Sequence, residues 1–410
     1  TPLPQQNTLF TNATVLTGTG ERIDNANVLF ANGKITGIGV NFTAKDATTV
    51  DATGKWITPG IIDVHSHLGV YPSPSVSSHE DGNEMTSPNT AEVWAEHSVW
   101  PQDPGFQAAR AGGITTLQIL PGSANLFGGR GVTLRNVPST TMQGMKFVDA
   151  PYGLKMACGE NPKRVYGTRK QLPSTRMGNV AGYRSAWSAA TEYKRAWNKY
   201  DADYAAGKNP VAPTRDLELD TLMGVLDGEI LIHNHCYKAE EMVVMMDLGK
   251  EFDYSSGTFH HAIEGYKIAD ELAQNGNCAA MWPDWWGFKM EAYDMVEENV
   301  AIVNAVKNSC AIVHSDSAVT IQRLNQEAGK ILYRANENGF ELQPKDAIKW
   351  ITLNAAKSLG VSDSTGSLEV GKKADVVLWN ANPFSVYAQA EQVFIDGAKF
   401  YDRVDKKYQA

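Results

Sequence analysis

The stretch Trp56-Ile57-Thr58-Pro59-Gly60-Ile61-Ile62-Asp63-Val64-His65-Ser66-His67 decides how the fold of this chain is interpreted. It begins as an apolar, strand-like run and ends in two histidines that are two residues apart. In an extended strand, residues i and i+2 project from the same face, so His65 and His67 are expected to point into one space. Histidine nitrogen is a preferred ligand of zinc. The stretch therefore predicts a buried strand that ends in a pair of metal ligands.

Three more segments far away in the chain carry residues of the same ligand types: His233-Asn234-His235, His260-His261 and His314-Ser315-Asp316. His233 shares a strand face with His235, and His314 shares one with Asp316. In the doublet, an extended backbone would point only one of the two rings inward. A barrel of parallel strands is the simplest scaffold that gathers such strand ends around one point. Imidazole and carboxylate groups suit zinc and its neighbours, so we expect a buried metal site.

The rest of the chain supports a barrel with a smaller β domain. Residues 59–360 alternate strands with helices, as parallel βα units do, while both chain ends are rich in strands. The predicted fold class is α/β, a (β/α)8 TIM barrel with a small β-sandwich domain built from both chain ends. Residues 1–58 plus 361–410 would form the composite sandwich and residues 59–360 the barrel. The expected helices are Arg176–Ala206, Leu217–Leu226, Glu264–Gln274, Glu291–Lys307 and Ile321–Asn336.

Composition excludes several classes of protein. The 410 residues carry a net charge of -9 without a lysine or arginine block, so nucleic acid is not an expected partner. No apolar run approaches the roughly 18 residues of a membrane helix. The chain starts at Thr1 without methionine, which leaves periplasmic or secreted export open. A homo-oligomer is also left open.

The four cysteines are widely spaced and include no Cys-x-x-Cys pair. This spacing predicts neither a zinc ribbon nor a disulfide framework. Free cysteine is among the most buried residue types, so we expect four buried free thiols, two of them, Cys158 and Cys236, close to the metal ligands.

With these residues in view, the chain resembles the amidohydrolase superfamily of metal-dependent hydrolases, and it is most similar to the subgroup of imidazolonepropionase-like proteins and metallo-dipeptidases. The resemblance covers nearly the whole chain. It rests on residues 59–67, Gly112-Gly113-Ile114-Thr115-Thr116, His235, His261, Ser315-Asp316-Ser317 and Gly371-Lys372-Lys373-Ala374-Asp375. It implies a barrel with a two-part β-sandwich and one or two divalent metal ions at the barrel mouth. It further implies that His65, His67, His235 and His261 are ligands, and that Asp316 is both a ligand and the proton carrier.

At the fourth barrel strand the resemblance offers two ligands. Gly153-Leu154-Lys155-Met156 resembles the urease strand whose lysine is carboxylated to bridge two metals, and Gly159-Glu160-Asn161-Pro162 resembles a glutamate-bearing loop of mononuclear deacetylases. Burial lowers the pKa of a lysine, which frees a neutral amine to capture carbon dioxide as N6-carboxylysine. Glu160 needs no such modification. We keep both residues and place Lys155 first.

The expected activity is hydrolysis of an amide or cyclic amide C–N bond in a dipeptide, lactam or imidazolone by a metal-activated hydroxide, with Asp316 as general base and then acid. Zinc is the expected metal, although nickel, iron and manganese accept similar ligand sets. Arg130, Arg164 and Arg176 are candidate substrate contacts, because a guanidinium group binds a carboxylate in a bidentate manner. Tyr237 is a further candidate. The alternatives are a heterocycle deaminase and a non-catalytic amidohydrolase-like scaffold protein.

Overall fold

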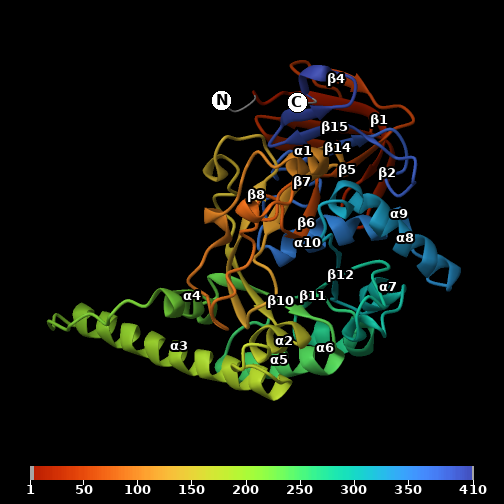
Figure 1. Ribbon diagram of the computed structural model, residues 1–410. Helices are drawn as coiled ribbons and strands as arrows, with labels where there is room; N and C mark the ends of the chain where they lie inside the picture. Colours follow the sequence, from red (N-terminus) through yellow and green to blue (C-terminus); the bar gives the residue numbers. More distant parts are fainter. Residues whose placement is uncertain (1–3, 409–410) are drawn as a thin grey trace.

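The two ends of the chain share one eight-stranded sheet. The computed structural model describes residues 4–408, and in Figure 1 the strands from the two ends lie together at the top of the molecule. The strand order is β16-β15-β14-β5-β1-β2-β3, and β4 pairs with β1. The bounds are β1 Thr8–Leu16, β2 Arg22–Ala31, β3 Lys34–Gly39, β4 Thr48–Asp51, β5 Trp56–Pro59, β14 Val376–Trp379, β15 Ala390–Ile395 and β16 Ala398–Asp402.

The two chain ends meet where β14 runs antiparallel to β5, with Val376 opposite Pro59 and Trp379 opposite Trp56. Rings of Phe10, Phe30 and Phe394 fill the core between the strands, with centroids 5.0 to 6.0 Å apart. Because β5 leads directly into the first barrel strand, this sheet fixes the point at which the chain enters the barrel. A sandwich of two packed layers, and domain borders after residues 58 and 360, stay predictions.

The second sheet has the order β13-β12-β11-β10-β9-β8-β7-β6 and forms the barrel. The first strand of the barrel, β6, is joined to the segment that follows the last strand, β13, where Asp316 N donates to His65 O at 3.0 Å. The bounds are β6 Ile61–Ser66, β7 Ile114–Ile119, β8 Phe127–Arg135, β9 Tyr152–Ala157, β10 Ile230–Cys236, β11 Thr258–His261, β12 Cys278–Met281 and β13 Cys310–Val313. This agrees with the predicted barrel.

One barrel strand departs from the parallel pattern. β8 runs antiparallel to both β7 and β9, because the connection 120–126 is far shorter than the dozen or more residues that a parallel crossover needs. Residues Gly128 to Gly131 lie inside this strand. Gly129 has a φ of +110°, and a Cβ there would lie 2.5 Å from Val93 O, so the position requires glycine.

The helices surround the barrel, and α3 with α4 extends from one side of it (Figure 1). The predicted helix 217–226 matches α4, and the predicted helix 176–206 matches α3 to within one residue. The predicted helix 291–307 is wrong in its first half, because Glu291 lies in a short 3-10 turn. The bounds are α1 Pro104–Ala111, α2 Glu160–Gly167, α3 Arg176–Ala205, α4 Leu217–Leu226, α5 Ala239–Phe252, α6 Ala269–Gln274, α7 Asn299–Ala305, α8 Leu324–Glu337, α9 Pro344–Ala347 and α10 Leu353–Ser358. None of the helices within residues 4–408 has the length and apolar character to cross a bilayer.

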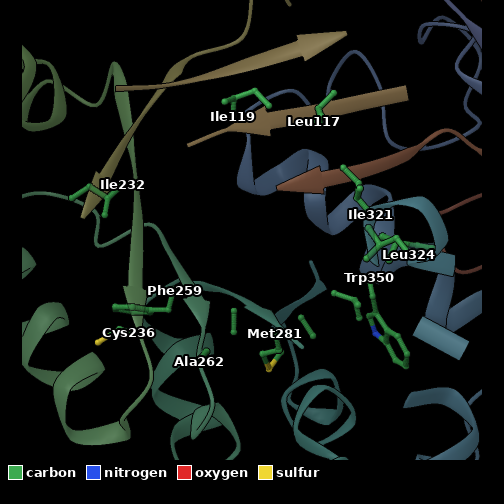
Figure 2. Close-up of a cluster of buried hydrophobic side chains, with 14 of the residues drawn as sticks. Leu117, Ile119, Ile232, Cys236, Phe259, Ala262, Met281, Ile321, Leu324 and Trp350 are labelled. Atoms are coloured by element: carbon green, nitrogen blue, oxygen red, sulfur yellow. The ribbon is translucent and has the colours of Figure 1, made fainter. Parts of the chain in front are cut away.

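Alternate residues of the barrel strands face the surrounding helices. Leu117 and Ile119 of β7, Ile232 of β10 and Phe259 of β11 belong to the large buried apolar cluster of Figure 2. The residues between them, such as Gln118 and His233, therefore face the barrel interior, because side chains alternate along a strand. These polar side chains form a layer inside the barrel, beneath the strand ends that carry the predicted ligands.

The cysteines are paired, and the prediction of free thiols is wrong. Cys158 bonds to Cys236 and Cys278 bonds to Cys310, with Cα atoms 5.2 and 4.5 Å apart. Cys278 and Cys310 are register partners on the adjacent strands β12 and β13. The two pairs are separated by 78 and 32 residues in sequence, so a rule based on local spacing does not detect them.

The pairing makes a direct prediction. When the protein is denatured without reductant, iodoacetamide is expected to label no cysteine, and after reduction it should label all four. Peptide mapping by mass spectrometry provides the measurement and identifies each pair. Labelling of two or more cysteines before reduction would contradict the pairing.

Candidate metal centre

The predicted ligands meet at the mouth of the barrel, at the floor of a cavity of about 490 Å³. They come from the ends of separate strands or from the residues that directly follow them, as the sequence pattern suggested. The cavity wall also carries aromatic and cationic side chains. Its lining residues include His65, His67, Tyr71, Lys155, Asn161, Arg164, His235, Tyr237, His261, Trp282, Trp285, Phe288, Lys289 and Asp316.

Asp316 is the centre of this group. Its Oδ1 lies 3.4 Å from His65 Nε2 and 3.1 Å from His67 Nε2, and its Oδ2 lies 3.9 Å from His261 Nε2. One donor atom from each of His65, His67 and Asp316 falls within 4.8 Å of the others. This spacing allows one ion to contact all three side chains.

The hydrogen bonds of His67 fit a cation at this point. His67 Nδ1 donates to Leu120 O at 2.8 Å, and a neutral ring that donates from Nδ1 has only a lone pair at Nε2. That lone pair faces the Asp316 carboxylate. Two acceptors at 3.1 Å require a positive charge between them, either a proton or a metal cation. The donor set, imidazole nitrogen and carboxylate oxygen, is the set that zinc prefers.

Burial keeps the other imidazoles neutral. It lowers the pKa of His65, His235 and His261 well below the ordinary value of 6.5. A neutral imidazole has a free lone pair, which a metal ligand needs. For Asp316, burial alone would raise the pKa. With a proton as the positive charge between His67 and Asp316, the hydrogen bond and charge of His67, with the charge of Lys155, hold the pKa of Asp316 below 3.8. Asp316 is therefore ionised at neutral pH.

The structure separates the two candidates for the fourth-strand ligand. Lys155 Nζ is buried in the cluster, 3.3 Å from His65 Nε2 and 3.0 Å from Pro121 O. Burial lowers the pKa of Lys155 from 10.5 to about 8. Glu160 instead begins α2, does not line the cavity, and lies 3.4 Å from Lys289 Nζ. Geometry therefore favours Lys155.

Both rings of the histidine doublet point inward, and the expectation that only one would do so is wrong. The expectation assumed an extended backbone, but His261 has a φ of +73° and Ala262 a φ of +36°. Asp316 has a φ of +49°. Such left-handed residues other than glycine are costly and cluster at functional sites. The turn at residue 261 places His260 in the floor of the site and His261 at its mouth.

Two polar residues hold the chain around the ligands. The carboxylate of Asp63 accepts hydrogen bonds from His65 N at 3.2 Å, from Ser315 N at 3.1 Å and from Ser315 Oγ. Burial raises the pKa of Asp63 to about 7 in spite of these bonds. Asp63 thus ties the end of β6 to the segment that carries Asp316.

A second group of nitrogens includes His314. One donor atom each of His65, His261 and His314 lies within 4.8 Å of the others. His314 Nε2 and His261 Nδ1 are 2.9 Å apart and share a hydrogen bond. His314 therefore supports His261 from behind.

The candidate substrate contacts fall into two groups. Tyr237 lines the cavity, whereas Arg130 and Arg176 do not. Arg130 Nε donates to Thr221 at 2.8 Å, and its guanidinium lies over Trp94. Arg176 is paired with Glu241 and Glu291. Both guanidinium groups therefore already have partners outside the cavity. Neither is kept as a candidate substrate contact.

Besides Lys155 on the floor, Arg164 and Lys289 line the cavity with cationic side chains. Lys289 lies over the Tyr237 ring at 4.3 Å and donates to Asn161 at 3.1 Å. Arg164 was noted in the sequence only as one of three arginines able to hold a carboxylate. Lys289 was missed because it lies in an irregular segment between β12 and α7, where no period marks which side chains face inward.

Comparison with known proteins agrees with this geometry. The model of the Amidohydrolase family matches residues 56–399. The chain is 30% identical over 395 residues to the amidohydrolase tasK of Hapsidospora irregularis, covering 92% of this chain but only 40% of that protein. It is 23% identical over 406 residues to an imidazolonepropionase of Rhizobium rhizogenes, with 88% of each chain covered.

A solved structure gives the same result. The crystal structure of an amidohydrolase from Thermotoga maritima MSB8 superposes with a TM-score of 0.87 at 34% identity, covering 97% of this chain and 100% of that chain. The family match covers the barrel, the predicted metal ligands, and the strands β5, β14 and β15 of the terminal sheet. This chain therefore belongs to the amidohydrolase family.

Proposed function

We propose that the protein is a zinc-dependent hydrolase that cleaves an amide C–N bond in a small substrate bearing a free carboxylate, such as a dipeptide or an N-acyl amino acid. The observation that carries the proposal is the position of Arg164 and Lys289 on the wall of the cavity whose floor holds His65, His67 and Asp316. The 30%-identical amidohydrolase and the imidazolonepropionase are consistent with amide chemistry.

His65, His67, His235, His261 and Asp316 would hold one or two divalent ions, with Lys155 as a further ligand once carboxylated. Bound there, a zinc ion supplies an activated water and polarises the scissile carbonyl. Asp316 accepts the proton of the attacking water at Oδ and returns it to the leaving nitrogen, because one carboxylate can act first as base and then as acid. Tyr237, Trp282 and Trp285 exclude bulk water from one side of the cavity.

The carboxylate of the substrate would bind at the cationic wall. Within residues 4–408, no carboxylate forms an ion pair with Arg164, and burial lowers the pKa of Lys289. A buried or half-buried cation gains from an incoming anion, and guanidinium holds a carboxylate in a bidentate manner. Aromatic rings beside these cations suit an apolar side chain or ring on the same substrate.

Removal of the Arg164 charge tests this assignment. In Arg164→Met, kcat/KM for N-acyl amino acids and dipeptides is expected to fall about 10- to 100-fold, since hydrogen bonds to charged groups contribute about 1.5–3 kcal/mol. The same compounds with an amidated C-terminus should be poor substrates of both proteins and should not distinguish them. Steady-state kinetics on the zinc-loaded enzyme, with Arg184→Met as a control on an exposed arginine, provides the measurement.

The products decide between the proposal and a deaminase. Amide hydrolysis yields one new carboxylate per turnover, whereas deamination of a heterocycle releases ammonia without a new carboxylate. Ammonia release from heterocycles without cleavage of any compound in the carboxylate series would reject the proposed substrate class.

A further inference from the structure

Beneath the metal centre, a column of three buried residues runs from His65 into the barrel interior. His65 Nδ1 lies 2.9 Å from His260 Nδ1, and His260 Nε2 lies 2.9 Å from His233 Nδ1. His233 Nε2 lies 3.2 Å from Gln118 Nε2. All three residues of the column, His260, His233 and Gln118, are at most 1% exposed. The column connects four strands, β6, β11, β10 and β7, across the inside of the barrel.

A neutral imidazole has one N–H and one lone pair, so each ring in the column donates on one side and accepts on the other. The hydrogen bonds must therefore all run in the same direction. As the amide lies in the structure, Gln118 Nε2 donates to His233 Nε2. The remaining bonds then run upward, His233 to His260 and His260 to His65. This direction leaves the hydrogen of His65 on Nε2, which faces Asp316 Oδ1 at 3.4 Å. Lys155 Nζ, 3.3 Å from the same nitrogen, then donates to Pro121 O at 3.0 Å and not to His65.

A cation at His65 Nε2 requires the reverse direction. His65 must then carry its hydrogen on Nδ1 and donate to His260, which donates to His233 from Nε2. His233 Nε2 in turn donates to Gln118, which must present Oε1 instead of Nε2. Gln118 Oε1 is buried and has no hydrogen-bond partner among residues 4–408. A half-turn of the amide exchanges the two atoms and completes the reversed column.

We propose that Gln118, His233 and His260 are positioning residues that orient His65 for metal binding, and that the column reverses direction as a unit when the metal binds. The inference rests on the metal centre of the proposed function. An amide is a neutral group that can end the column in either direction, which gives a reason for glutamine at residue 118. Gly153 provides the room: a Cβ there would lie 2.7 Å from Gln118 Nε2 and 2.8 Å from His233 Cδ2.

The direct test follows the two histidines that do not contact the metal. In full-length protein labelled with ¹⁵N-histidine, long-range ¹H–¹⁵N spectra distinguish rings protonated at Nδ1 from rings protonated at Nε2. Stripped of metal, the protein should have His233 and His260 protonated at Nδ1, and zinc should convert both to Nε2. Unchanged rings in a protein that binds zinc would overturn the inference alone. Failure to bind zinc at all would overturn the metal centre and the inference together.

Variants of the column separate orientation from packing. Gln118→Glu offers only acceptors, so it should hold both rings in the Nε2 form with and without zinc, and its zinc affinity should equal or exceed that of the parent. Gln118→Met keeps the shape without the acceptor and should bind zinc more weakly than Gln118→Glu.

His233 allows a second matched pair. The side-chain oxygen of His233→Asn can replace the accepting Nδ1, whereas His233→Leu cannot, so the asparagine variant should retain more zinc affinity. For the leucine variant we expect a loss of about 10- to 100-fold, as is typical when a group supporting a ligand is removed. Chelator competition measures zinc affinity. Equal affinities within both pairs, in variants with parental melting temperatures, would overturn the positioning role.

Discussion

Asp316→Asn is expected to lower kcat by about 10²- to 10⁴-fold, the usual contribution of general acid–base catalysis, while the protein still binds zinc. The amide has the shape of the carboxylate and keeps one oxygen for the cation, but it does not accept a proton from water at neutral pH. His65, His67, His235 and His261 would still be present as the proposed ligands. Metal content by elemental analysis and kcat on the best amide substrate are the two measurements.

The control for this substitution is Asp294→Asn, which makes the same chemical change on an exposed carboxylate paired with Lys267. It should leave both metal content and kcat unchanged. A zinc-loaded Asp316→Asn protein with near-parental turnover would reject Asp316 as the proton carrier. Loss of the metal along with activity would instead assign Asp316 mainly a ligand role.

The sequence predicted which side chains gather at the barrel mouth because their signal is local. His65 and His67 project from one strand face whatever the rest of the chain does, and Asp316 follows the same strand-end pattern. The fold followed for a similar reason, since alternating strands and helices leave few topologies besides a barrel. Where a strand end coincides with a regular alternation of side chains, the sequence alone is sufficient to predict which side chains face the site.

The errors concern residues whose position depends on distant neighbours. The disulfide Cys158–Cys236 depends on which strands lie side by side, and the direction of β8 depends on the length of one loop. The inward ring of His260 depends on the positive φ of His261. None of these features has a period in the sequence. Lys289 lies on an irregular segment, so only the structure places it in the cavity wall.

The segment Gly371-Lys372-Lys373-Ala374-Asp375, by which the chain resembles its family, has a structural role through its last residue. Asp375 lies just before β14 of the terminal sheet and forms a two-pronged, buried ion pair with Arg135 of the barrel strand β8. It also accepts from Thr365 Oγ1 at 2.5 Å and from Asp396 N at 3.0 Å. This pair is a polar link between the barrel and the sheet built from both chain ends.

Asp375→Ala is expected to lower the free energy of unfolding by about 3–5 kcal/mol, because it leaves the Arg135 guanidinium buried with its main partner removed. Arg135→Met should cost a similar amount, and the double variant less than the sum of the two, since removing both charges leaves neither uncompensated. Glu192→Gln breaks an exposed ion pair with Arg195 and should change stability by less than about 1 kcal/mol. Denaturant unfolding of each variant under oxidising conditions gives the comparison.

The pH dependence provides a check that packing alone would not produce. Burial by itself would raise the pKa of Asp375, but Arg135 holds that pKa below the ordinary value of 3.8. A carboxylate whose pKa is lower in the folded state adds stability above the unfolded pKa, and that stability is lost as the pH falls through the folded value. The gap in stability between the parent and Asp375→Ala should therefore be full at pH 6 and should narrow below about pH 4. A gap that stays constant over this range would mean that Asp375 acts through its shape and hydrogen bonds, and not through its charge.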